Sequence, residues 1–110
     1  MALSLFSKKK ILFEEKITVG EFDPSADGAY RNVKTFPVNV KQGEMFISVD
    51  SDRPVDIAVS NGNGICIKFK ESILNDVIGP IRIADKDTMA LAVGVFRGDK
   101  AEPEIRIWMG

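Results

Sequence analysis

Apolar and polar residues alternate along the middle of the chain, between Phe36 and Phe69. Alternation with a period of two places every second side chain on the same face of a β-strand. Four such runs predict an antiparallel sheet with one face in a core. The residues predicted to face inward are Phe36, Val38 and Val40, then Met45, Ile47 and Val49, then Val55, Ile57 and Val59, then Ile65, Ile67 and Phe69.

Turn-forming residues separate these runs. Residues 50–54, with two aspartates, a serine and a proline, predict a turn between two strands. Residues 61–64 read Asn-Gly-Asn-Gly and predict a hairpin, because Asn-Gly tolerates the positive φ of a tight turn. Pro37 cannot donate a ladder hydrogen bond, so its strand is predicted to lie at an edge or to carry a bulge.

The alternation stops at residues 71–79. Four apolar residues there are spaced like one face of a helix: Ile73, Leu74, Val77 and Ile78. The segment is too short to form a stable helix alone, and Gly79-Pro80 ends the pattern. We therefore predict a single helical turn, or a loop that plugs one end of a sandwich.

The first strand is predicted from residue 11 onward. Ile11, Phe13, Ile17 and Val19 share the inward parity, and Glu15 interrupts it, which indicates an edge strand or a bulge. Residues 1–10 contain a lysine run and predict a flexible N-terminal arm. Residues 20–29 are rich in turn formers and predict an irregular connection.

The last two apolar runs are the most regular. Met89, Leu91, Val93 and Val95 alternate with alanine and glycine, which predicts a central strand that is buried on both sides or closely approached on one. In the final strand Ile105, Ile107 and Met109 are predicted to face inward, and Glu104, Arg106 and Trp108 outward. A terminal strand is often an edge, and we expect that here.

Together these runs give seven or eight strands at intervals of about ten residues, with glycine and proline between them. That spacing predicts an all-β fold, an antiparallel β-sandwich of jelly-roll type, as a single domain over residues 11–110.

Part of the chain resembles known sandwich domains. Phe36-Pro37-Val38, Gly43, Ile47-Ser48-Val49, the stretch 51–59 and the late strand 89–95 are similar to the middle and the penultimate strand of Golgi-dynamics (GOLD) and pre-peptidase C-terminal domains. The resemblance covers about half of the chain. It implies a non-catalytic, jelly-roll-like module that is used for protein contacts.

Composition and charge narrow the function. Hydrophobic residues make up 45% of the chain, as in ordinary soluble domains, and the formal net charge is −1. Without a basic excess we expect no nucleic-acid partner. No apolar run approaches the length of a membrane span, so we expect no span and a cytoplasmic location.

The chain has no histidine and one cysteine, Cys66. This excludes Ser-His-Asp and Cys-His catalysis and the usual zinc sites within one chain, and no disulfide can form inside it. We therefore predict that the protein is not an enzyme and has no resident cofactor. A free cysteine is more often a small buried hydrophobe than a reactive thiol, so Cys66 is predicted to be buried.

Aspartates gather near the predicted turn at 50–54. Asp50, Asp52 and Asp56 offer hard oxygen ligands at nearby positions, and such oxygens hold Ca²⁺ in proteins. Aspartate is also favoured in turns for backbone reasons alone. Calcium binding at these three residues therefore remains an alternative to a purely structural role.

Three aromatic residues take the outward parity on their strands: Phe46, Phe96 and Trp108. With Arg106 beside Trp108, they are candidates for a partner-binding surface, since exposed apolar patches mark interaction sites. The alternative is that a second sheet or the 71–79 plug covers them. The sequence thus predicts a non-enzymatic protein-interaction module, a small subunit or adaptor, acting through a sheet face or edge on a protein partner or a second copy. A sandwich that binds Ca²⁺ or a small molecule at its loop end is the alternative.

Overall fold

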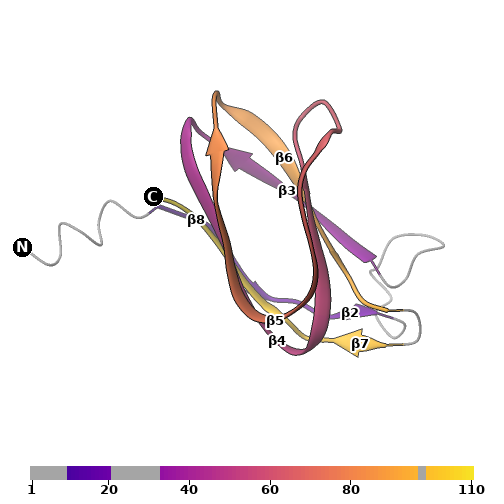
Figure 1. Cartoon of the computed structure of the whole chain (residues 1–110). Coiled ribbons are helices and arrows are strands. Elements are labelled where there is room, and N and C mark those ends of the chain that lie inside the picture. The colour runs from indigo at the N-terminus through magenta and orange to yellow at the C-terminus, as the bar shows by residue number, and fades with distance from the viewer. Residues whose placement is uncertain (1–9, 21–32, 97–98) are drawn as a thin grey trace, which may run out of the picture.

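Eight β-strands and no helix make up the part of the chain that the computed structural model describes, residues 10–20, 33–96 and 99–110 (Figure 1). The strands are β1 Lys10–Lys16, β2 Val19–Gly20, β3 Val33–Val40, β4 Gly43–Ser60, β5 Cys66–Ile83, β6 Asp87–Gly94, β7 Lys100–Ala101 and β8 Glu104–Met109. All pairings are antiparallel. The all-β prediction and the strand number are confirmed. Within the described ranges no helix is long and apolar enough to cross a membrane.

Strand β4 belongs to both halves of a curled sheet with the strand order β1-β8-β4-β6-β3. Its residues 45–50 pair with β8 and its residues 56–60 pair with β6, while β5 runs beside it along both stretches. We call the half that contains β1 and β8 the first layer, and the half that contains β3 and β6 the second layer. Each layer takes one half of β4 and one half of β5, and Figure 1 shows both strands curving between the layers.

The bend of β4 lies at residues 51–54, where we predicted a turn. Four residues of β4 stand here against one residue of β5, because the register passes from Asp50↔Asn75 to Val55↔Ile73. Extra residues in one strand of a pair bend that strand and increase its twist. The turn prediction is therefore wrong, and the same turn-forming residues bend a continuous strand instead.

Side chains at the bend take over hydrogen bonds that a regular ladder would make. The Ser51 hydroxyl donates to the Arg53 carbonyl at 2.5 Å, and the Arg53 N–H donates to the Ser51 hydroxyl oxygen at 3.3 Å. On β5, Ser72 has a φ of 54°, in the left-handed region that few non-glycine residues adopt. Both strands therefore leave regular β geometry at the same corner of the sheet.

The core lies between the two layers and consists of every second residue of most strands. In β6, Met89, Leu91 and Val93 are buried and the alternate residues are half-buried, and β6 pairs on both sides, which confirms it as a central strand. The buried apolar residues are Ile17, Val19, Val38, Val40, Met45, Ile47, Val49, Val55, Ile57, Val59, Ile73, Ile78, Ile81, Ile83, Met89, Leu91, Val93, Val95, Ala101, Ile105, Ile107 and Met109. Burial of one such side chain stabilises the fold by about 1.5–3 kcal/mol.

Residues 71–79 are strand, so the predicted helical turn or plugging loop is wrong. Ile73 and Ile78 are both buried although they lie five positions apart, an odd spacing that a regular strand would send to opposite faces. The corner and a second register shift, opposite Met45 and Ile47, return both side chains to the core. Because of these two irregularities, the buried residues of this strand segment are spaced in the sequence like those on one face of a helix.

The first half of β5 does not face the core as predicted. Ile65, Ile67 and Phe69 are exposed, and so is Cys66, which we expected to be buried. The hairpin at 61–64 forms, with the Gly64 N–H donating to the Asn61 carbonyl at 2.9 Å, but a register shift follows it between Val59 and Ser60. As a consequence, Lys68 and Lys70 lie on the core-side face of this part of β5, opposite Val59 and Ile57.

Among the described strands of the six-stranded sheet, those with a partner on one side only are β1, β3 and β5. Strand β8 lies between β1 and β4, so the expectation of an edge position for the last strand is wrong. The one described strand that pairs with β3 is β6, which agrees with the edge position predicted from Pro37. Residues 1–9 of the predicted arm, and residues 21–29 of the predicted connection, lie outside the described residues.

Strand β1 is also an edge strand, and its register shifts between Ile11 and Phe13. The edge or bulge predicted from Glu15 is therefore present. Ile11 was predicted to face inward but is 50% exposed, because the shift turns it to the outer face.

Candidate interaction surface

Two aromatic side chains stack on the outer face of the first layer. Phe46 of β4 lies opposite Trp108 of β8, and their ring centroids are 5.6 Å apart with an angle of 13° between the ring planes. Their strand neighbours Met45, Ile47, Ile107 and Met109 point into the core, so both rings face outward. Directly opposed side chains on one face of an antiparallel pair are the closest neighbours that a sheet offers.

The apolar surface continues onto a third strand. Ile11 of β1 lies opposite Trp108 on the side away from Phe46, and half of its surface is exposed. Phe46 and Trp108 are each half-buried. We call Ile11, Trp108 and Phe46 the aromatic row. It crosses β1, β8 and β4, three adjacent strands of the first layer.

Two glycines, Gly79 and Gly110, lie beside Phe46 at one end of the aromatic row. A Cβ at Gly79 of β5 would lie 2.8 Å from the Met45 carbonyl oxygen and 3.0 Å from the Phe46 ring. A Cβ at Gly110 would also come within 3.0 Å of that ring. Gly79 has a φ of 134°, which side-chain-bearing residues rarely adopt. The absence of side chains at Gly79 and Gly110 therefore leaves space for the Phe46 ring.

Ion pairs flank the aromatic row on both sides. Arg106, two positions before Trp108 on β8, places Nε 2.5 Å from the Glu14 carboxylate of β1. On the other side, Arg82 of β5 lies 4.0 Å from the Glu44 carboxylate of β4. Both pairs are well exposed and contribute little to stability. An apolar centre with a charged border is the usual composition of a protein–protein contact.

The structure brings together three of the four residues that the sequence singled out for partner binding. Phe46, Trp108 and Arg106 lie side by side on the first layer. Phe96 is 82% exposed but follows the end of β6, whose Gly94 lies opposite Asp56 in the second layer. It therefore does not belong to the row. Strand 71–79, proposed as a cover for the aromatics, lies beside Phe46 and leaves the two rings half-exposed.

Sequence reasoning missed Ile11 and Glu14 as members of this surface. Ile11 shares its parity with Phe13 in the sequence, and only the shift between them separates their faces. The interruption of the apolar pattern at Glu15 was the one signal of that irregularity.

Two of the three aspartates proposed as calcium ligands accept hydrogen bonds from backbone N–H groups. Asp52 Oδ1 accepts a hydrogen bond from the Glu102 N–H at 2.7 Å, and this bond lowers the pKa of Asp52 below its ordinary value. Asp56 Oδ1 accepts from the Ser72 N–H at 2.9 Å, at the corner of β5. Asp50 is exposed on β4. Among the described residues no three carboxylate, cysteine or histidine side chains lie together in a way that could hold a metal ion. Calcium binding stays a prediction.

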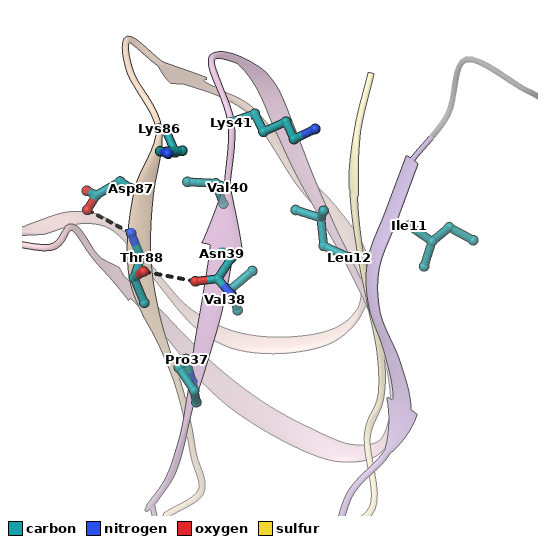
Figure 2. Close-up of a pocket in the computed structure, with 10 residues that line it drawn as sticks. All are labelled: Ile11, Leu12, Pro37, Val38, Asn39, Val40, Lys41, Lys86, Asp87 and Thr88. Carbon is teal, nitrogen blue, oxygen red and sulfur yellow. Dashed lines mark hydrogen bonds between the residues drawn. The ribbon is translucent and has the colours of Figure 1, made fainter.

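A cleft of about 790 Å³ lies between the edge strands of the two layers, β1 and β3 (Figure 2). Leu12 and Ile11 point to opposite sides of β1, and Lys41 and Lys86 lie at one end of the cleft, near Val40. The Thr88 hydroxyl donates to Asn39 Oδ1 at 2.8 Å along its wall. The cleft combines apolar and polar groups, as sites for small molecules do.

No protein-family model matches the chain, and no curated protein matches it in sequence. The resemblance to GOLD and pre-peptidase C-terminal domains therefore stays a prediction.

Proposed function

We propose that this protein is a non-enzymatic interaction module, a small subunit or adaptor, that binds a protein partner through the aromatic row. The observation that carries the proposal is the half-exposed stack of Phe46 on Trp108, extended by Ile11 and flanked by two ion pairs. Tryptophan is the residue most often found at the energetic centre of protein contacts.

The position of the row favours binding over a structural role alone. The three side chains project from paired strands, so their positions are fixed before a partner arrives and little conformational entropy is lost on binding. Their core-side neighbours already fill the interior. A partner that covers the row would remove its remaining apolar surface from water, at about 25 cal/mol per Å².

We further propose a cytoplasmic location, because the chain has one cysteine and its fold depends on no internal disulfide.

A second candidate function is the binding of a small molecule in the cleft between β1 and β3, whose volume of about 790 Å³ lies within the range of ligand sites. Such a ligand would raise the melting temperature in proportion to its affinity for the folded state.

The test compares matched variants of the purified full chain as bait in extracts of its own cells. Trp108→Ala should remove the specific partner, since truncation of a central tryptophan costs about 2 kcal/mol or more of binding free energy. Ile11→Glu should remove the same partner, because it places a charge at the edge of the row. Phe96→Ala is the control, since it truncates an exposed aromatic outside the row.

Folding of each variant is checked by thermal unfolding, so that loss of a partner is not confused with loss of structure. If a partner is retained equally by Trp108→Ala and the unchanged protein, or lost equally with Phe96→Ala, the aromatic row is not its binding surface.

A further inference from the structure

The first seven residues of β5 include no buried residue. All seven residues from Cys66 to Ser72 are exposed, on both faces of the strand. Strands in layered β-proteins normally bury at least one face. The exposed apolar side chains near this stretch include Ile65, Ile67 and Phe69, and Phe69 is 54% exposed. This strand half therefore has apolar surface that the described part of the fold does not use.

One edge of this strand half is also open. Residues Phe69 and Lys70 pair with Ala58 and Ile57 of β4, and no described strand pairs with the opposite edge of β5. An open edge presents a row of backbone N–H and C=O groups, which another extended chain can pair with. The geometry is that of a sheet able to accept one more strand.

The two faces of this edge differ in chemistry. Lys68 and Lys70 lie opposite Val59 and Ile57, on the core-side face. Phe69 lies opposite Ala58 on the outer face, where it borders a shallow groove of about 210 Å³. An added strand would thus meet cations on one face and an aromatic ring on the other. Lys70 already pairs with Asp76 at 2.5 Å, so Lys68 is the cation best placed for a new contact.

We infer that the edge of β5 at residues 66–71 binds an extended segment of a partner protein, whose alternate side chains are acidic and apolar. The acidic side chains would lie opposite Lys68, and the apolar side chains beside Phe69. This surface lies in the second layer and is separate from the aromatic row.

Charge disfavours a second copy of the chain as the occupant. Antiparallel self-pairing centred on Phe69 would place Lys68 opposite Lys70 of the other copy, and pairing centred on Lys68 would oppose two copies of Lys68. Like charges directly opposite each other destabilise a strand pair. Edge lysines also prevent unselective pairing between sheets, so a matching acidic strand is the partner that they admit.

The test measures binding of fluorescently labelled eight-residue peptides to the purified full chain. A peptide of alternating glutamate and valine should bind. A peptide of alternating lysine and valine, and a glutamate–valine peptide with alternate backbone amides N-methylated, should each bind at least tenfold more weakly. The methylated peptide keeps the side chains but cannot form the strand ladder, so equal binding by it would overturn strand addition.

Matched variants locate the site. Lys68→Glu should reverse the preference, so that the lysine–valine peptide binds better. Lys16→Glu makes the same charge change at an exposed position of β1, which pairs with β8 and not with β5, and should leave the preference unchanged. Amide hydrogen exchange should slow within residues 66–71 when the glutamate–valine peptide is added. Absence of binding, or protection confined to other strands, would overturn the inference. Trp108→Ala should leave peptide binding unchanged, which separates this edge from the aromatic row.

Discussion

Lys70 and Asp76 form an ion pair with 2.5 Å between Nζ and Oδ2, although both belong to β5 and lie six residues apart. In a regular strand six residues span about 20 Å. The pair therefore closes the corner at which β5 passes from the second layer to the first. Ser72, with its φ of 54°, lies between the two partners.

The corner pair predicts a pH dependence. The hydrogen bond from Lys70 holds the pKa of the Asp76 carboxyl below its ordinary value of 3.8. Because the folded-state pKa is the lower one, the contribution to stability is fully present above pH 3.8 and is lost as the pH falls through the folded-state pKa. Titration of the Asp76 carboxyl by NMR should give this lowered pKa. In Lys70→Met it should return toward 3.8, and an unchanged pKa would show that the pair is absent in solution.

The core predicts a strong contrast in stability between substitutions at buried positions and at an exposed position of neighbouring strands. Ile57 and Val93 are at most 1% exposed and lie opposite each other in β4 and β6. Ile57→Ala should lower the free energy of unfolding by about 2–4 kcal/mol, because it removes packed atoms and leaves a cavity. Val93→Ala should also destabilise the protein clearly.

Lys68→Ala is the matched control in these denaturant titrations. It truncates an exposed residue of β5 that lies opposite Val59, two positions from Ile57 on β4, and such changes usually stay within about 0.5 kcal/mol. A cost equal to that of Ile57→Ala would contradict the exposure of the Lys68 side chain in the second layer.

Strands with regular alternation were predictable from the sequence, and strands with bends were not. In β6 and β8 every second residue is buried, and the apolar pattern alone gave their faces correctly. In β5 the corner at Ser72 and the register shift near Gly79 break the period of two. The apolar residues between these two points are therefore spaced as on one face of a helix, although they form a strand. Bulges depend on pairing with a distant strand, which a local pattern does not contain.

The candidate surface shows the same limit. Outward parity identified Phe46 and Trp108 separately, but their stacking depends on the register between β4 and β8, which are far apart in the chain. The same outward parity predicted that Phe96 belongs to the surface, but Phe96 follows the end of β6 in the second layer, away from Phe46 and Trp108. The exposed edge of β5 was missed because Ile65, Ile67 and Phe69 alternate as core residues do.

Gly79 predicts a cost of substitution with two parts. In Gly79→Ala the new Cβ would meet the Met45 carbonyl and the Phe46 ring, and the φ of 134° would strain any side-chain-bearing residue. Backbone strain alone typically costs about 1–3 kcal/mol, and we expect Gly79→Ala to lower the free energy of unfolding by more than this. The fluorescence of Trp108 should also change, because Phe46 must move.

Gly64→Ala separates the two parts. Gly64 also has a positive φ, of 79°, but a Cβ there would meet nothing within 4 Å. Its substitution should cost about 1–2 kcal/mol in thermal unfolding and leave the tryptophan emission unchanged. Equal losses of stability in the two variants would mean that the close approach of Phe46 to Gly79 adds nothing to the cost of the substitution.

The stack itself predicts an energetic coupling between Phe46 and Trp108. Their centroid distance of 5.6 Å lies in the range in which aromatic pairs gain about 0.5–1.5 kcal/mol beyond the burial of their area. A double-mutant cycle with Phe46→Leu and Trp108→Leu, followed by denaturant unfolding, should return a coupling of that size, since leucine keeps the apolar contact and removes the ring. The cycle that pairs Phe96→Leu with Trp108→Leu should be additive to within about 0.5 kcal/mol, because distant sites act independently. Additivity in both cycles would show that the two rings are not in contact in solution, and the aromatic row would then lose its rigid centre.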